Sequence, residues 1–212
     1  LHNLGFSFVE IGSISPNPQE GNEKPRIFRT YNKITNRCGL NNDGIDIVKT
    51  RLYENKKVTD DLNVYSKNSL GYNHVNTVHD NFIYKNIKNK ILGISLVKNN
   101  ESIDFEDYLN DFKTGIINLQ DYSDYMVLNI SCPNVKNKEL NIEELDLLLE
   151  HCRHICSKAL LIKLSPDLKD SEYIKISNLC LKHSINGIIL TNTMKSKDGG
   201  ISGTRDLYNR SN

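Results

Sequence analysis

A six-residue segment in the middle of the chain carries side chains that could do acid–base chemistry. It reads Asn129-Ile-Ser-Cys-Pro-Asn134 and follows an apolar stretch typical of a strand. Asn amides both donate and accept hydrogen bonds, which suits recognition of a planar heterocycle with alternating carbonyl and N–H groups. Cys132 could act as a base near neutral pH if its surroundings lower the thiol pKa from about 8.5. A buried structural thiol beside turn-forming amides is the alternative that these residues leave open.

A second group of residues has the composition of a metal site but not its geometry. His151, Cys152, His154 and Cys156 lie within one amphipathic stretch. Helical periodicity places both cysteines on the apolar face and both histidines elsewhere, so the four side chains cannot close one tetrahedral site. We therefore expect structural thiols and surface imidazoles here, and we predict no metal site in the chain.

The elements that must position the six-residue segment follow from the hydrophobic pattern. Five short apolar segments are rich in β-branched residues, and their continuous hydrophobicity indicates strands covered on both faces, as in parallel sheets. The predicted strands are Phe6 to Gly12, Ile91 to Val97, Tyr125 to Ser131, Leu160 to Ser165 and Gly187 to Asn192. Helical patterns lie between the later strands, at Phe105 to Leu119, Ile142 to Lys158 and Ser171 to His183. This alternation predicts an α/β fold with function at the carboxyl ends of the strands.

Polar or small residues are predicted at the end of every one of these strands. In a barrel such positions meet at one rim, where side chains from different strands can surround a ligand. For a single strand they would merely mark where the strand stops, but five in succession favour a binding site. The residues are Glu10 to Ser13, Ser95, Asn129 to Cys132, Lys163 and Thr191 to Thr193.

Composition limits the class of protein. The chain has 212 residues, with 27 Lys and Arg against 26 Asp and Glu, and five cysteines without C-x-x-C pairs. This composition is globular, the scattered cysteines favour free thiols, and the near-neutral charge gives no reason to expect nucleic acid as a partner. The segment from Tyr53 to Lys90 is polar with few aliphatic residues and is predicted to be a mobile surface insertion.

Eight motifs resemble the dihydroorotate dehydrogenase family, in the order in which that family carries them, and they span nearly the whole chain outside the polar insertion. They are Gly5 to Ser13, Pro18 to Asn22, Pro25 to Arg29, Asn36 to Leu40, Asn129 to Asn134, Lys163 to Asp167, Thr191 to Thr193 and Gly199 to Gly203. The resemblance implies a flavin-dependent (β/α)₈ TIM barrel that oxidises dihydroorotate to orotate in pyrimidine biosynthesis. The domain expected is a partial FMN-binding barrel over residues 1–212, with the insertion at about 53–90.

The resemblance also assigns roles to individual residues. Cys132 matches the catalytic base that removes the C5 proton while hydride leaves C6 for the flavin N5. Lys163 would stabilise negative charge on the reduced flavin ring. Positions that hold the substrate are matched by Asn36, Cys38, Gly39, Leu40, Asn129, Asn134, Asn192 and Thr193. Positions around FMN are matched by Ser13, Ser95, Asn129, Lys163, Thr191 and Gly203.

The resemblance is strongest to the membrane-associated class that passes electrons to a quinone, and Arg29 matches a position lining its quinone site. That class ordinarily carries Ser where this chain has Cys132, whereas Cys is usual in the soluble class that uses fumarate or NAD. The dispersed motifs favour the quinone class, hence the mitochondrial inner membrane, with the soluble, cytoplasmic class as the alternative. Ser95 also replaces an Asn common near the flavin.

The length is shorter than a complete barrel requires. Five strands cannot close an eight-stranded barrel, and they match the second to sixth strands of the family. We therefore expect a chain truncated at both ends, lacking the first strand and the last two, which bind the FMN phosphate. Membrane contact would need an N-terminal element, which we expect this chain to lack. A non-catalytic fragment is one alternative, and another FMN barrel, such as a dihydrouridine synthase, is disfavoured by the lack of a basic surface for tRNA.

Overall fold

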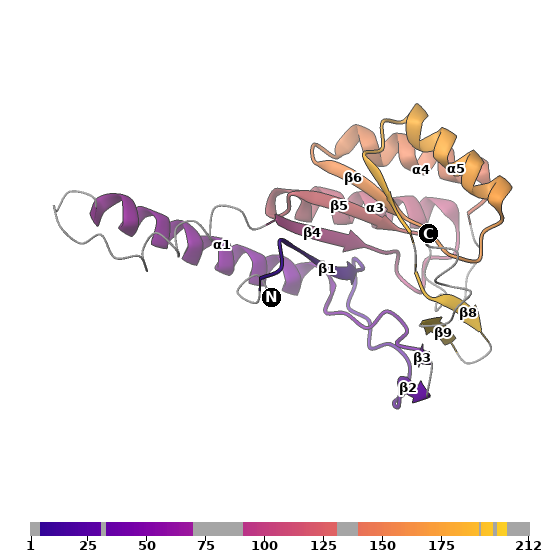
Figure 1. Ribbon diagram of the computed structural model, residues 1–212. Helices are drawn as coiled ribbons and strands as arrows, with labels where there is room; N and C mark the ends of the chain where they lie inside the picture. Colours follow the sequence, from indigo (N-terminus) through magenta and orange to yellow (C-terminus); the bar gives the residue numbers. More distant parts are fainter. Residues whose placement is uncertain are drawn as a thin grey trace.

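The computed structural model describes residues 5–30, 33–69, 91–130, 140–190, 192–196 and 199–202. Its centre is a sheet of five parallel strands in the order β1-β4-β5-β6-β7 (Figure 1). The strands are β1 (Phe8–Ile14), β4 (Ile91–Leu96), β5 (Tyr125–Asn129), β6 (Ala159–Lys163) and β7 (Gly187–Ile189). Consecutive strands with helical crossovers are neighbours, as in a (β/α)₈ barrel, so the predicted fold class is confirmed for this part of the barrel.

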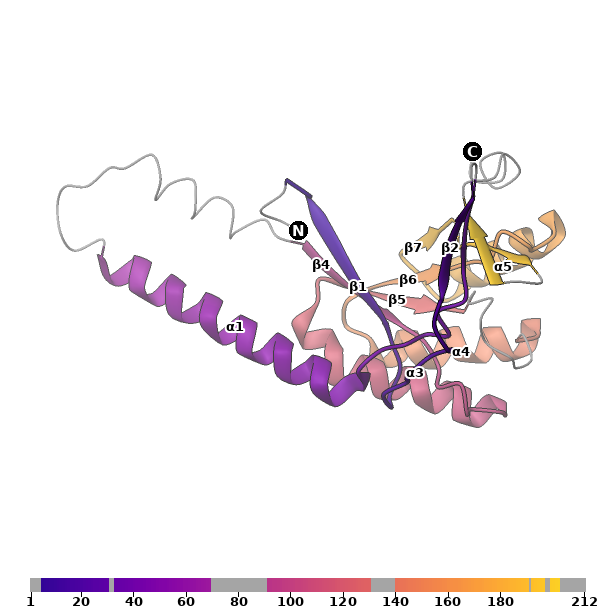
Figure 2. The ribbon, with the colours of Figure 1, turned by 90° about the horizontal axis from the view of Figure 1, so that it is seen from below.

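Three helices cover one face of this sheet (Figure 2). They are α3 (Phe105–Leu119), α4 (Ile142–Ile155) and α5 (Asp170–Lys182), and a short 3₁₀ helix, η2 (Gln120–Tyr122), follows α3. The side chain of Asp104 caps α3 by accepting from the backbone N–H of Asp107, and Asn141 and Glu144 form a capping box at the start of α4. These caps satisfy backbone donors that a helix start otherwise leaves unpaired.

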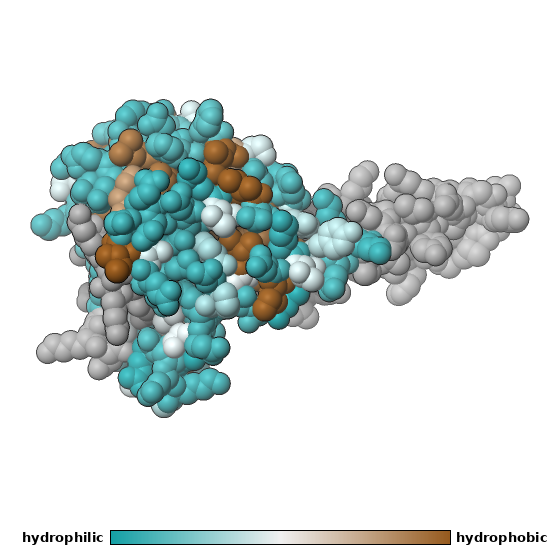
Figure 3. All heavy atoms as spheres, turned by 180° about the vertical axis from the view of Figure 1, so that it is seen from behind, coloured by the Kyte–Doolittle hydropathy of each residue, from teal (hydrophilic) through white to brown (hydrophobic). Residues whose placement is uncertain are grey.

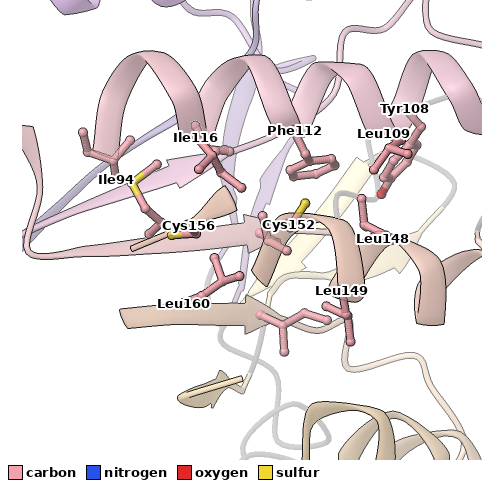
Figure 4. Packing of buried hydrophobic residues seen from close by; sticks show 14 of the residues in the cluster. Ile94, Tyr108, Leu109, Phe112, Ile116, Leu148, Leu149, Cys152, Cys156 and Leu160 are labelled. Atoms are coloured by element: carbon pink, nitrogen blue, oxygen red, sulfur yellow. The ribbon is translucent and has the colours of Figure 1, made fainter. Parts of the chain in front are cut away.

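The hydrophobic core lies between these helices and the sheet (Figure 4). Phe112 and Ile116 of α3, Leu148 of α4, Ile94 of β4 and Leu160 of β6 are fully buried. Alternate strand residues point the other way, toward the inside of the barrel, because successive side chains of a strand leave on opposite faces. The core therefore fixes which residues the strands present to the barrel interior and its rim.

The predicted elements are all present, but several boundaries differ. Strand β1 runs to Ile14, so Glu10 lies inside the strand opposite Gly93 rather than at its end, and the Tyr125 hydroxyl donates to its carboxylate. The prediction that Glu10 marks a strand end was wrong. Helix α4 ends at Ile155, three residues before the predicted end, because Cys156 already has extended backbone angles.

A second sheet of four short antiparallel strands was not predicted. Its order is β2-β3-β9-β8, with β2 (Ile27–Thr30), β3 (Lys33–Asn36), β8 (Met194–Ser196) and β9 (Gly199–Ser202). The hairpin of β2 and β3 follows β1, and β8 follows β7, so both segments leave the carboxyl ends of parallel strands. This small sheet therefore lies beyond the carboxyl edge of the main sheet (Figure 1).

Helix α1 (Gly44–Ser69) extends well beyond the main sheet (Figure 1). Its first part packs on the core through Ile45, Val48 and Leu52. The helix includes the first part of the predicted insertion, so residues 53–69 are helical, which their composition did not indicate. Whether this segment is an insertion stays a prediction. Brown apolar side chains form separate small groups on the mainly hydrophilic face in Figure 3, and no described helix is long and apolar enough to cross a membrane.

Candidate functional site

Three predicted cofactor residues form one hydrogen-bonded cluster at the carboxyl ends of β1, β4 and β5. The Asn129 side-chain amide donates to the Ser13 hydroxyl over 2.8 Å, and the hydroxyls of Ser13 and Ser95 share a hydrogen bond of 2.9 Å. Asn129 and Ser95 are buried. The strand register brings these three side chains together, as the sequence predicted.

Gly12 lets β1 approach β4 closely beside this cluster. Its φ is +120°, and a Cβ built there would lie 2.4 Å from the Ser95 carbonyl oxygen. Real Cβ atoms do not approach so near, and most side chains disfavour this backbone region. A glycine is therefore required for the hydroxyls of Ser13 and Ser95 to meet.

Lys163 stands next to the cluster, at the end of β6. It lies directly opposite Asn129 in the parallel register, so the two side chains leave the same face of the sheet. Within the described ranges no carboxylate forms an ion pair with the half-buried Lys163 ammonium. The nearby Asp167 instead accepts from the Lys195 backbone N–H and the Ser165 hydroxyl. The described residues therefore form no ion pair with Lys163.

Two predicted substrate residues meet at the small sheet, Asn36 in β3 and Thr193 just before β8. The Asn36 side-chain amide of β3 donates to the Gly200 carbonyl of β9 over 3.4 Å. A Cβ on Gly200 would lie 2.2 Å from the Thr193 hydroxyl and 3.2 Å from the Asn36 amide nitrogen. Asn36 and Thr193 are therefore brought together around Gly200. The neighbouring Asn192 is tied to the main sheet, because its N–H donates to the Leu164 carbonyl.

The predicted substrate residues Cys38, Gly39 and Leu40 form a loop after β3. Gly39 and Leu40 have φ values of +72° and +57°, so the loop reverses through the left-handed region. The Cys38 carbonyl accepts from the Asn22 N–H over 3.1 Å. Cys38 is a free, half-buried thiol, unlike the buried thiols of the helices.

The remaining predicted positions are separate from these groups or lie outside the description. Arg29 is exposed on β2, where it pairs with Ile34 of β3. It takes no part in the hydrogen bonds of the cluster formed by Ser13, Ser95 and Asn129. The predicted base Cys132 and three further predicted site residues lie outside the described residues, and their roles stay predictions. These three are Asn134, Thr191 and Gly203.

The four residues that resemble a metal site in composition are divided as expected. Cys152 and Cys156 are buried in the core (Figure 4). His151 and His154 are exposed on α4. Burial raises the pKa of the Cys152 thiol to about 12. A thiol that stays protonated at neutral pH is a poor nucleophile, so the structural interpretation of Cys152 is confirmed.

Sequence reasoning gave no role to two residues at this edge. Gln19 joins three loops, and Gly200 is the point where Asn36 and Thr193 meet. Both lie in motifs singled out above, Pro18 to Asn22 and Gly199 to Gly203. The Gly-Gly pair was a signal of close backbone approach, whereas no local pattern indicated the contacts of Gln19.

The parallel strands with outer helices and polar residues at the carboxyl edge define part of a (β/α) barrel, a fold that usually places its ligand sites at that edge. A family profile described as dihydroorotate dehydrogenase matches residues 1–205. The chain belongs to the dihydroorotate dehydrogenase family.

Named relatives agree with this family. The "dihydroorotate dehydrogenase (quinone), mitochondrial" of Arabidopsis thaliana is 32% identical over 228 residues, which cover 95% of this chain and 45% of that protein. The "dihydroorotate dehydrogenase (quinone)" of a Nocardioides species is 35% identical over 207 residues, 92% of this chain and 52% of the relative. The chain thus spans about half the length of these relatives.

Solved structures show the same fold. The ligand-free DHODH of Eimeria tenella superposes with a TM-score of 0.70 at 28% identity, over 96% of this chain and 59% of that one. DHODH from the same organism in complex with ferulenol gives a TM-score of 0.72 at 26% identity, over 98% of this chain and 61% of that one.

Proposed function

We propose that the protein carrying this chain oxidises dihydroorotate to orotate in pyrimidine biosynthesis, with FMN as cofactor. Family membership supports the reaction. The observation that carries the proposal is the hydrogen-bonded cluster of Ser13, Ser95 and Asn129 beside the ammonium of Lys163, which no described carboxylate neutralises. A ligand with polar edges and negative charge needs buried polar groups and a cation, and the described residues at the carboxyl edge supply both.

The residues present fit a flavin. Ser13, Ser95 and Asn129 offer hydroxyl and amide groups that can donate and accept along the edge of a heterocycle. Lys163 supplies a fixed positive charge on the same face of the sheet, where it would stabilise an electron-rich ring. When bound, FMN would accept the hydride that leaves C6 of the substrate. We assign Thr191 and Gly203 to the same site from the family resemblance.

We propose that the small sheet and its loops hold the substrate. Asn36 and Thr193 meet around Gly200, and amide and hydroxyl groups there suit the alternating donors and acceptors of a dihydropyrimidine ring. The substrate set also includes Cys38, Gly39, Leu40, Asn129, Asn134 and Asn192 by family resemblance. Cys132, as the thiolate, takes the proton from C5 of dihydroorotate.

For the electron acceptor we propose a quinone. The relatives from Arabidopsis thaliana and Nocardioides carry "(quinone)" in their names, and Arg29 is exposed at the small sheet. We further propose the mitochondrial inner membrane as the location, since the plant relatives from Arabidopsis thaliana and Oryza sativa are named mitochondrial. The names of the bacterial relatives do not include that word.

The test is anaerobic rapid mixing of the FMN-loaded protein with dihydroorotate, followed by flavin absorbance. Cys132→Ala should slow flavin reduction by about 10²- to 10⁴-fold, the usual contribution of a positioned base. Cys132→Ser should shift the rate profile to higher pH, because a hydroxyl loses its proton less readily than a thiol. Unchanged rates in Cys132→Ala would exclude Cys132 as the base.

Lys163→Met tests the cation, with Lys158→Met as its control. Lys158 is also half-buried and lies just before the same strand, but at the opposite edge of the sheet. Lys163→Met should weaken FMN binding and slow flavin reduction, while Lys158→Met should do neither. Equal effects of the two substitutions would contradict the proposed position of FMN.

A further inference from the structure

Gln19 lies where three loops at the carboxyl edge meet. Its side-chain oxygen accepts from the Asn100 N–H over 2.7 Å, in the loop after β4. Its side-chain nitrogen donates to the Ser15 hydroxyl over 2.9 Å and to the Leu40 carbonyl over 3.4 Å. Its backbone exchanges two hydrogen bonds with Asn42, of 2.9 and 3.0 Å. One side chain thus links the loop after β1, the loop after β4 and the loop after β3.

The segment around Gln19 lies directly against the loop after β3. A Cβ on Gly21, whose φ is +77°, would be 2.3 Å from the Cys38 carbonyl oxygen. The Asn22 N–H donates to that same carbonyl over 3.1 Å, and the Asn22 side chain donates to the Arg37 carbonyl over 2.8 Å. The two segments therefore pack backbone to backbone and are joined by hydrogen bonds.

The loop after β4 is in turn fixed to helix α3. The Asp111 carboxylate accepts from the Asn99 N–H over 2.7 Å, from the Asn99 side chain over 3.0 Å and from the Ser102 hydroxyl over 2.5 Å. The Asn99 side-chain oxygen accepts from the Asn17 N–H over 3.0 Å. Asn99 and Ser102 are buried, so water competes little for these hydrogen bonds.

From these contacts we infer that Gln19 is a positioning residue for the substrate. Its hydrogen bonds join Leu40 to the loop after β4, which is itself fixed to α3. Gln19 thereby holds Gly39 and Leu40, in the loop after β3, in the conformation that binds an anionic pyrimidine. Asn100 assists, because its side chain donates to the Gly39 carbonyl over 3.4 Å. The inference rests on the proposed function and gives the Pro18 to Asn22 motif a role.

The chain offers a matched control for Gln19 at the opposite edge of the sheet. The Gln120 side-chain oxygen accepts from the N–H of Ser157 over 2.9 Å and from its hydroxyl over 3.1 Å, and the nitrogen donates to the Ile155 carbonyl over 3.3 Å. Gln120 therefore also joins two segments through three side-chain hydrogen bonds. A substitution there removes comparable contacts without touching the proposed substrate loop.

The experiment compares Gln19→Met and Gln120→Met in the FMN-loaded protein, because Met keeps the length of Gln and loses its polar groups. Orotate affinity is measured by calorimetry, with FMN content and thermal unfolding alongside. In Gln19→Met the orotate dissociation constant should rise about tenfold, equivalent to ~1.4 kcal/mol. FMN content should stay at the parent level, and in Gln120→Met the orotate affinity should be unchanged.

A second measurement keeps the test informative if Gln19→Met is unstable. Amide hydrogen exchange of Gly39 to Asn42 should accelerate in Gln19→Met but not in Gln120→Met. Equal orotate affinity and equal exchange in the two variants would overturn the inference. A parent protein that binds FMN but no orotate would refute the proposed substrate, and the inference with it. A parent that binds orotate as tightly as Gln19→Met does would refute only the role of Gln19.

Discussion

Replacing Ser13 by Ala would remove the hydroxyl that joins the side chains of Asn129 and Ser95. Two hydrogen bonds would be lost, of 2.8 Å and 2.9 Å. At about 0.5–1.5 kcal/mol net for each bond, the free energy of unfolding should fall by ~1–3 kcal/mol. If this cluster holds FMN, one lost contact to the cofactor should also raise its dissociation constant about two- to tenfold.

Ser123→Ala is the control for this prediction. The buried Ser123 hydroxyl also makes two hydrogen bonds, to the Gln120 carbonyl over 3.2 Å and to the Met126 sulfur over 3.0 Å. It lies before β5, whereas Asn129 ends that strand. Chemical denaturation measures stability, and fluorescence titration of the apoprotein measures FMN affinity. Equal FMN affinities of Ser13→Ala and Ser123→Ala, despite comparable losses of stability, would refute the assignment of the cluster to FMN.

Two further predictions concern the barrel interior and the core. Gly93→Ala would place a Cβ 2.0 Å from the Tyr125 ring and should lower the free energy of unfolding by ~1–3 kcal/mol. Its control is Gly187→Ala, where the nearest atom would lie 3.4 Å away and the free energy of unfolding should change by less than about 1 kcal/mol. Denaturant titrations measure both. Because burial raises the pKa of the Cys152 thiol from 9.0 to about 12, its protonated state contributes stability that is full below pH 9 and declines as the pH rises toward 12. Between pH 9 and 12, the free energy of unfolding of the parent protein should fall by up to ~1.4 kcal/mol per pH unit more than that of Cys152→Ala. Parallel stability profiles of the two proteins against pH would contradict this prediction.

The main sheet could be predicted because its inner strands β4 and β5 are mostly buried on both faces, whereas β1 and β7 are largely half-buried or exposed, which the sequence did not predict. Burial on both faces produces continuous apolar runs such as Ile91 to Leu96 and Tyr125 to Asn129. The helices between the strands follow the 3.6-residue period. Boundaries were less certain, since Glu10 interrupts the apolar pattern of β1 while remaining inside the strand. The meeting of Ser13, Ser95 and Asn129 also followed from topology alone, because parallel strands end at one edge.

The small sheet and helix α1 could not be predicted for different physical reasons. Strands β2 and β9 have four residues each, and every residue of β2 is exposed, so burial leaves no pattern to detect. The second half of α1 is polar and departs from the core that would impose an apolar stripe. The contacts of Gln19 join loops distant in sequence, and no local propensity encodes them.

The central claim is that the carboxyl edge holds FMN next to dihydroorotate. Anaerobic mixing of the FMN-loaded protein with dihydroorotate tests it most directly. The account predicts that the flavin absorbance bleaches and that one orotate forms per flavin. In Cys132→Ala, no bleaching should occur on the timescale of the parent reaction. A flavin that stays oxidised in the presence of excess dihydroorotate, in protein with stoichiometric FMN, would contradict it.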